Sequence, residues 1–282
     1  METRIDGHLT KVCAGCEGWL YDDWRTLRGG PTIFFPPGTR PAEYLSFYAK
    51  IFDTVEINTS FYSIPKLSNF ESWYRQVPEH FRFSLKMPRD VTHVDNLSKY
   101  SYPLAEEFIR RTAMLKNKLG AILIQLPASF KMTAATVSNL TGFLKFIPRD
   151  LSFAVEFRSV EWFSPEIFAL LAEYNVALCL GQNKFLSREI MLEALTAPSA
   201  DFAYFRFSGL RDLTKLDRIQ RPQDESLDFW AAQIKLLTDK RSFVYFSNLF
   251  EGFSPASAMN FRKLLGQTFP TPQELNPAPS LF

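Results

Sequence analysis

Five segments of the chain alternate apolar and polar residues as β-strands do. They are residues 54–58, 83–86, 122–125, 153–158 and 203–208. Successive side chains of a strand point to opposite faces, so each segment has one apolar and one polar face. The polar faces carry charged and amide side chains towards their C-terminal ends: Glu56, Asn58, Lys86, Gln125, Glu156, Arg158 and Arg206. Because such groups are costly to bury unless paired or solvated, the pattern predicts strands that end at one polar pocket.

The whole chain alternates strand-like and helix-like segments. Strands are predicted at residues 12–15, 54–58, 82–87, 121–125, 152–157, 176–181, 202–207 and 243–247. Helices are predicted between them, among others at residues 41–51, 102–119, 133–146, 165–174, 225–238 and 255–265. Eight alternations in about 250 residues are typical of a (β/α)8 TIM barrel, an α/β fold with its active site at the C-terminal ends of the strands. A doubly wound open sheet is the alternative, although its central strands would normally be apolar throughout.

Composition indicates an ordinary globular protein. The 282 residues are 46% hydrophobic with a formal net charge of +2, and no block of like charge names a partner. We expect one domain over residues 1–282, with residues 269–282 as an extended, proline-containing tail. Residues 1–10 are polar, no apolar run reaches the ~20 residues that span a bilayer, and the chain has only three cysteines. These features predict a cytoplasmic protein without a membrane partner.

An ordered set of short motifs resembles the YecE-like family, catalogued as domain of unknown function 72. The matching positions include Gly15 to Trp19 with Tyr21 and Trp24, Val55 to Asn58 with Phe61 and Tyr62, Phe81 to Phe83 with Lys86, Thr92 and His93, Gln125 to Pro127, Val155 to Arg158 with Trp162, Tyr204 to Arg206, and Tyr245 to Asn248. The resemblance implies a TIM barrel and, as the family name says, no settled activity.

The chain departs from that family pattern at several positions. Glu17 stands where a small residue is common, and Ser208 stands where a histidine often precedes the glycine after the seventh strand. Gln182 ends the sixth strand in place of an acidic or hydroxyl residue, and Ser247 replaces the first of two asparagines. A mechanism that needs those groups is not expected here.

Glu56, Glu156 and Lys86 are the candidate catalytic residues. Two carboxylates near one pocket can have their pKa values pushed apart, so that one acts as an acid and the other as a base or nucleophile. Lys86 could act as an amine of lowered pKa or bind an anion. The structural alternative is that Glu156 pairs with Arg158 or Arg206, and Glu56 with Lys86.

Further residues near strand ends are candidates for binding a ligand. Arg158 and Arg206 offer planar forks to a carboxylate or phosphate, the amides could orient a polar group, and aromatic rings could form a wall for a sugar or base. The full set is Trp19, Asn58, Tyr62, His93, Gln125, Arg158, Trp162, Arg206 and Asn248. Ion pairing, loop hydrogen bonds and core packing are the structural alternatives for these residues.

No metal or cofactor is expected. The chain has only three histidines, and Cys13 and Cys16 have CxxC spacing without a second pair. Phosphate-loop, dinucleotide and serine-hydrolase motifs are absent from the sequence. Residues 28–38, with Phe34 and Phe35, are a candidate lid, and residues 210–224 follow the seventh strand, where many barrels bind phosphate.

Three classes of function remain open from the sequence. The first is a metal-independent enzyme that uses acid/base chemistry on a small polar, anionic or sugar-like ligand. The second is a nucleic-acid-binding or repair protein similar to barrel endonucleases, for which strongly salt-dependent affinity would be diagnostic. The third is a ligand-binding barrel without turnover.

Overall fold

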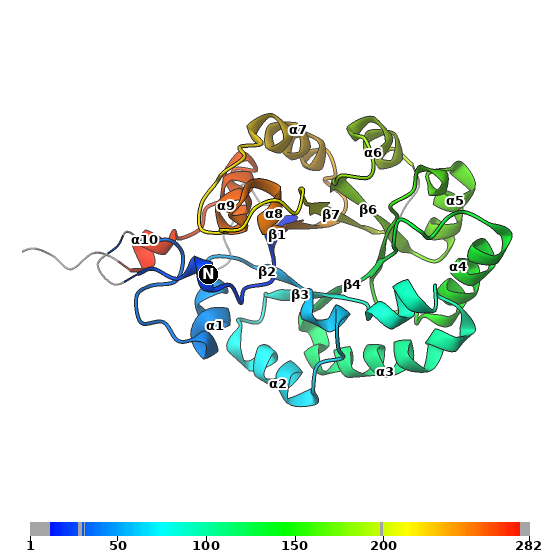
Figure 1. Cartoon of the computed structure of the whole chain (residues 1–282), viewed down its shortest axis with the longest axis horizontal. Helices are drawn as coiled ribbons and strands as arrows, with labels where there is room; N and C mark the ends of the chain where they lie inside the picture. Colours follow the sequence, from blue (N-terminus) through cyan, green and yellow to red (C-terminus); the bar gives the residue numbers. More distant parts are fainter. Residues whose placement is uncertain (1–11, 28–29, 31, 198–199, 277–282) are drawn as a thin grey trace, which may run out of the picture.

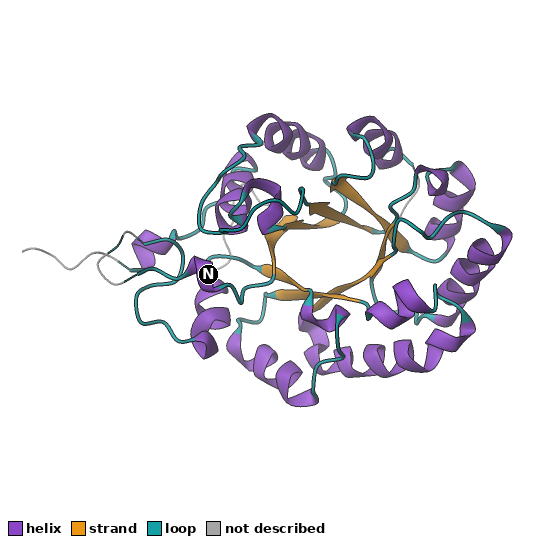
Figure 2. Ribbon diagram, in the orientation of Figure 1, coloured by secondary structure: helices purple, strands orange, loops and turns teal. Residues whose placement is uncertain are grey.

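The chain folds into a closed barrel of parallel strands surrounded by helices (Figures 1 and 2). The computed structural model describes residues 12–27, 30, 32–197 and 200–276. Within these residues eight strands pair in sequence order, and β1 closes the barrel against β8. The strands are β1 Val12–Glu17, β2 Thr54–Ile57, β3 Arg82–Lys86, β4 Leu119–Gln125, β5 Phe153–Glu156, β6 Val176–Gln182, β7 Phe202–Phe207 and β8 Arg241–Phe246. The predicted (β/α)8 fold is confirmed, and the open sheet is excluded.

Helices follow the strands and form the outer layer. They are α1 Tyr44–Tyr48, α2 Leu67–Gln76, α3 Tyr102–Thr112, α4 Ala134–Phe146, α5 Pro165–Glu173, α6 Arg188–Leu195, α7 Asp224–Lys235, α8 Asn248–Glu251, α9 Ser254–Leu264 and α10 Pro272–Leu275. Side chains at their first turns explain several of the starts: the Ser164 hydroxyl accepts the amide of Ile167 ahead of Pro165, and Thr133 caps α4 in the same way. No helix in the described ranges is long and apolar enough to cross a bilayer.

Three expectations for individual segments are corrected. The tail expected to be extended contains the short helix α10, while residues 277–282 lie outside the described residues, as does the start at residues 1–11. In the candidate lid at residues 28–38, Phe34 and Phe35 are fully buried and the ring of Phe35 stacks on Tyr44 at 3.9 Å, as in a rigid connecting loop, while residues 28, 29 and 31 lie outside the described residues. The predicted helix at residues 102–119 ends earlier: α3 stops at Thr112, and a 3₁₀ segment follows at Ala113–Lys118, in which Lys116 has a φ of 48°.

Two separate layers of side chains fill the fold. The outward face of each strand packs against the helices in one large apolar core, as Val55, Phe83 and Phe205 do. The inward faces form a smaller cluster, in which small residues of β4 to β6 lie with the aromatic rings of β7 and β8: Ala121, Leu123, Ala154, Ala177, Cys179, Ala200, Phe202, Tyr204, Phe243 and Tyr245. Below the mouth, the hydroxyls of Thr54, Ser84 and Tyr245 hydrogen-bond to one another inside the barrel. Charged and amide residues occupy the last inward positions, at the C-terminal mouth.

Gly181 lets β6 approach β7 closely at this polar end. Its φ is +116°, a left-handed conformation that side chains rarely adopt. A Cβ built there would lie 2.3 Å from the backbone oxygen of Arg206, the residue paired with it across the two strands. The absence of a side chain at Gly181 therefore allows the backbone of Arg206 to lie this close to β6.

Gly181→Ala is expected to lower the free energy of unfolding by more than about 2 kcal/mol, since backbone strain and a backbone clash each cost about 1–3 kcal/mol. Gly38→Ala is the matched control. Gly38 also has a positive φ, of +83°, but nothing lies within 4 Å of the place that a Cβ would take there. Urea unfolding of both variants measures the difference, and equal losses would show that the close approach to Arg206 is unimportant.

Candidate functional site

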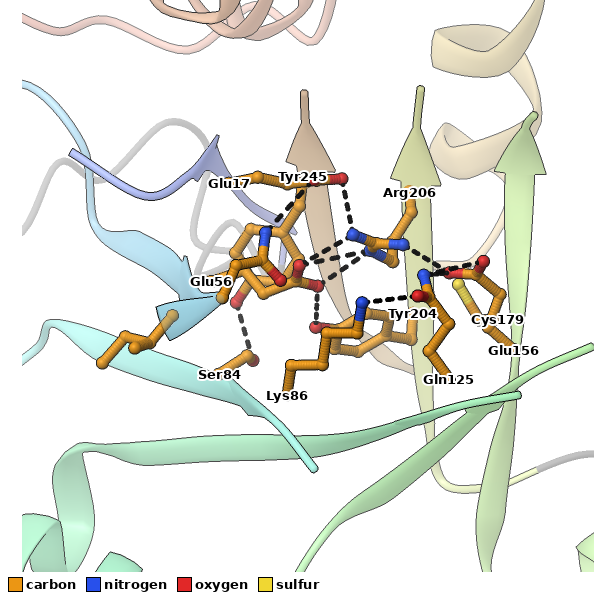
Figure 3. A network of polar contacts seen from close by, with 12 residues as sticks. Glu17, Glu56, Ser84, Lys86, Gln125, Glu156, Cys179, Tyr204, Arg206 and Tyr245 are labelled. Atoms are coloured by element: carbon orange, nitrogen blue, oxygen red, sulfur yellow. Dashed lines mark hydrogen bonds and ion pairs between the residues drawn. The ribbon is translucent and has the colours of Figure 1, made fainter. Parts of the chain in front are cut away.

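Three carboxylates converge on the guanidinium of Arg206 at the mouth of the barrel (Figure 3). Glu56, on β2, accepts from Nε at 3.0 Å and from Nη2 at 3.0 Å. Glu156, on β5, accepts from Nη1. An oxygen of Glu17, on β1, lies 2.8 Å from Nη2 as an ion pair that is not aligned for a hydrogen bond. One cation from β7 thus links three strands across the barrel.

The groups around Arg206 complete a buried polar network. The Tyr204 hydroxyl donates to Glu56 at 2.7 Å, and burial raises the pKa of Tyr204 well above its usual value, so it stays a donor. The Gln125 amide donates to both oxygens of Glu156 at 2.9 Å, and Arg158 Nε donates to Glu156 at 3.0 Å. Every carboxylate oxygen of Glu156 is therefore engaged.

The structure brings most of the predicted polar residues together, but it places two of the catalytic candidates behind the pocket. Glu56 is fully buried and Glu156 is 3% exposed, and neither lies on the pocket wall. Burial alone would raise the pKa of Glu156, but the cations of Arg206 and Arg158 and the Gln125 hydrogen bond lower it to about 2. Glu156 pairs with both Arg158 and Arg206, which is the structural alternative given above for this residue. Glu56 pairs with Arg206 and not with Lys86.

An open pocket of about 830 Å³ lies over this network. Its wall contains many of the predicted ligand-binding residues, together with Lys86: Trp19, Asn58, Tyr62, His93, Gln125, Arg158 and Arg206. It also contains Phe61, another of the aromatic rings after strand ends, and residues that were not predicted as ligands: Glu17, Trp73, Arg89, Lys184, Phe185, Ser208, Arg211 and Ser247. The wall holds six lysines and arginines but one carboxylate, that of Glu17, although Arg158 and Arg206 pair with carboxylates behind the wall.

Trp162 and Asn248 are corrections to the predicted ligand-binding set. The Trp162 ring is fully buried between Phe130 and Phe157, and its Nε1 donates to the Phe130 carbonyl at 2.7 Å. The Asn248 Oδ1 accepts from Trp24 Nε1 at 3.2 Å and from Ser254. Both residues hold loops in place below the mouth. The prediction failed because a position after a strand end does not decide where a side chain points.

Glu17 is the residue that the sequence pattern did not reveal. The predicted strand ended at residue 15, so Glu17 was not assigned to its inward face. In the structure β1 continues to Glu17, and the alternation runs from Cys13 through Gly15 to Glu17. Burial, together with the nearby Glu56 and Glu156, raises the pKa of Glu17 to about 7 despite Arg206. The Asn58 Nδ2 donates to its Oε2 at 3.2 Å. Glu17 is thus an acid that faces the pocket and titrates near neutrality.

Lys86 faces the same pocket from β3. Its ammonium donates to Gln125 Oε1 and lies 3.9 Å from the centre of the Phe61 ring. Burial and the positive charge of Arg206 lower the pKa of Lys86 to about 8. His93, edge-on to Phe61 and bonded to the Thr92 hydroxyl, has a pKa lowered to about 4 by burial and by Lys86, so it is neutral at pH 7.

The cysteines and carboxylates give no metal centre. Cys13 and Cys16 are free, and in a strand their spacing of three places them on opposite faces. Burial raises the pKa of both thiols, Cys13 to about 11 and Cys16 to about 12. Across the described part of the chain, no group of three or more histidines, cysteines and carboxylates is placed to hold a metal ion.

Arg206→Met is expected to lower the free energy of unfolding by about 3–5 kcal/mol, because it leaves buried carboxylates without their cation. The loss should be smaller at pH 5 than at pH 8, since unpaired carboxylates in the folded protein take up protons more readily at low pH. Arg221→Met, which removes a partly exposed partner of Asp212, is the control and should change stability by less than about 1 kcal/mol. Equal effects in the two variants would contradict the central role of Arg206.

The titration of Glu17 gives a second test. Folding raises its pKa from 4.5 to about 7, so its protonated form contributes stability that is complete below about pH 4.5 and lost as the pH rises through about 7. Over that range the wild type should lose stability relative to Glu17→Gln, measured by urea unfolding. Carboxyl-carbon NMR should show a midpoint near 7 for Glu17, with Glu156 ionised throughout. A Glu17 midpoint near 4.5 would contradict the prediction.

Comparison with known proteins places the chain in a family. The family model described as "Protein of unknown function DUF72" matches residues 13–281. The chain is 32% identical to the UPF0759 protein YecE of Escherichia coli (strain K12) over 43% of each chain. It is 30% identical to the UPF0759 protein YunF of Bacillus subtilis (strain 168) over 56% of this chain and 54% of YunF. These matches span about half the length of each relative.

Solved structures agree with the fold. A DUF72 family protein from Thermotoga maritima superposes with a TM-score of 0.73 at 25% identity, covering 91% of this chain and 99% of that one. A D-psicose 3-epimerase gives a TM-score of 0.53 at 10% identity over 82% of this chain and 95% of that one, a likeness of fold alone. Because the family model matches nearly the full length, the chain belongs to the DUF72 family of proteins of unknown function.

Proposed function

We propose that this protein is a metal-independent enzyme that carries out acid/base chemistry on a small anionic ligand at the C-terminal mouth of the barrel. The observation that carries the proposal is the pair formed by Glu17 and Lys86 on one pocket wall. Their pKa values of about 7 and about 8 lie near neutral pH, where proton transfer by a side chain is most effective. The basic wall around them supports an anionic ligand.

Proton transfer is assigned to Glu17 and Lys86 instead of the carboxylate pair Glu56 and Glu156. Near pH 7 both forms of Glu17 are populated, so it can accept or deliver a proton, and Asn58 orients one of its oxygens. Lys86 is mostly protonated and can stabilise negative charge that develops on the ligand. Glu56 and Glu156 act as positioning residues, because their carboxylates hold Arg206 and do not reach the pocket wall.

The carboxylate arrangement supports metal independence. Glu17, Glu56 and Glu156 meet at the guanidinium of Arg206, which takes their charge. A divalent cation at this point would have to displace an arginine that is itself 7% exposed and held by all three. All three carboxylates are therefore already paired with a cation.

Glu17→Gln is expected to lower turnover by about 10²–10⁴-fold, the usual contribution of a general acid or base. The measurement follows a panel of small hydroxy, oxo and phosphorylated sugar-like compounds in D2O with a chelator, using NMR to detect conversion and deuterium uptake. Glu225→Gln, which removes a carboxylate that is 87% exposed and off the pocket wall, should turn over normally.

Glu156→Gln separates positioning from proton transfer. It should melt at lower temperature, because Arg206 and Arg158 lose a charged partner, yet retain most turnover while folded. A stable but inactive Glu156→Gln protein would return the catalytic role to Glu156. Turnover lost on chelation and restored by a divalent cation would contradict metal independence, and a panel with binding but no conversion would favour a ligand-binding barrel.

A further inference from the structure

The two sides of the pocket differ in chemistry. The loops after β1 and β2 contribute aromatic rings, and Trp19 meets Trp73 of α2 edge to face at 5.9 Å beside Phe61 and Tyr62. The loops after β5, β6 and β7 contribute cations, namely Arg158, Lys184 and Arg211. A ligand that fits both sides carries a negative group at one end and a ring at the other.

Two of these cations gather on one aromatic ring. The guanidinium of Arg158 lies 4.8 Å from the centre of the Phe185 ring, and the ammonium of Lys184 lies 5.2 Å from the same centre. The loop after β7, which carries Arg211, is next to the loop after β6 because those strands are paired. Three adjacent loops therefore direct positive charge towards one region of the wall.

Most donors of these three cations have no partner among the residues that the structure describes. Arg158 bonds Glu156 through Nε, and its two terminal nitrogens have no acceptor among residues 12–27, 30, 32–197 and 200–276. In the same ranges Lys184 and Arg211 have no carboxylate partner. By contrast, Arg218 and Arg221, on the same loop as Arg211, pair with Asp217 and Asp212. Two cations without a carboxylate partner, next to an arginine with free terminal donors, are what an anionic ligand requires.

We propose that Arg158, Lys184 and Arg211 form a subsite for the dianion of a phosphate monoester, whose sugar or base lies against the aromatic side. The inference rests on the proposed function, since it names the class of ligand for the same pocket. A carboxylate is satisfied by one arginine fork, whereas a terminal phosphoryl group presents three oxygens and two charges to groups arriving from several directions. The volume of about 830 Å³ is ample for a sugar phosphate or a nucleotide.

Calorimetric titration of the full chain tests the subsite. The ligands are ribose 5-phosphate, a nucleoside 5′-monophosphate, the unphosphorylated ribose and nucleoside, inorganic phosphate, and a single-stranded oligonucleotide without terminal phosphates. Each monoester should bind at least about tenfold more tightly than its unphosphorylated counterpart, as expected for hydrogen bonds to charged groups. The tighter of the two monoesters identifies whether the source is a sugar phosphate or a nucleotide.

Lys184→Ala and Arg211→Ala should each weaken monoester binding about tenfold. Lys215→Ala is the matched control, because it removes the same charge from the loop after β7 at an exposed position off the pocket wall. Its affinity for the monoesters should stay within about twofold of the wild type, as expected for a surface charge without a ligand contact. Tyr62→Ala should reduce the preference for monoesters over inorganic phosphate, while Tyr100→Ala, equally exposed at 77% but off the wall, should not.

The subsite would be overturned if phosphorylated ligands bound no better than unphosphorylated ones. It would also be overturned if Lys215→Ala weakened monoester binding as much as Lys184→Ala and Arg211→Ala do. Tighter binding of the oligonucleotide than of the monoesters would overturn it too and would indicate a strand-binding protein. The outcome is distinguishable from that of the proposed function. Glu17→Gln should keep monoester affinity while losing turnover. Loss of turnover in Glu17→Gln without phosphate selectivity would refute the subsite alone, and phosphate selectivity with normal turnover in Glu17→Gln would refute the proton-transfer role alone.

Discussion

The guanidinium of Arg206, held by three carboxylates, is the interaction on which the mouth of the barrel depends. Glu17, Glu56 and Glu156 come from β1, β2 and β5, so without a shared cation they would repel one another in a poorly solvated layer. Only arginine offers five donors in a rigid plane, which lets one side chain serve three partners. Gly181 matters for the same reason, because it sets the backbone from which Arg206 extends.

The same network separates the protonation behaviour of Glu156 from that of Glu17. Glu156 gains Arg158 and Gln125 as further partners, and its pKa falls to about 2. Glu17 has a misaligned ion pair and one amide donor, so burial and the neighbouring carboxylates dominate and its pKa rises to about 7. The positive charge of Arg206 acts together with burial to lower the pKa of Lys86. The network that stabilises the mouth therefore also produces an acid and an amine that titrate near neutrality.

The fold could be predicted because the two faces of a strand lie in different environments. The alternation of apolar and polar residues along the sequence therefore indicates both the strand and the face that each residue occupies. Five of the eight strands were predicted from this alternation, and their inward polar positions brought Glu56, Lys86, Gln125, Glu156 and Arg206 to one layer. Glu17 was missed because two residues at the end of β1 were not assigned to the strand. Trp162 was misassigned, and Phe34 and Phe35 were expected to be exposed, because local sequence does not report which way a loop side chain turns.

The loop cations were unpredictable for a related reason: Lys184 and Arg211 resemble any surface charge until the fold shows that acids do not neutralise them. The strands and loops thus have separate tasks. The strand ends supply a fixed network whose geometry follows from buried ion pairs, whereas the loops supply most of the remaining pocket wall. Glu17 stands between the two, on a strand but facing the pocket. Without Glu17, Arg206 would still pair with Glu56 and Glu156, so the pairing of Arg206 does not depend on this third carboxylate. Glu17 is therefore the member of the network that can change its protonation with the least effect on the other ion pairs.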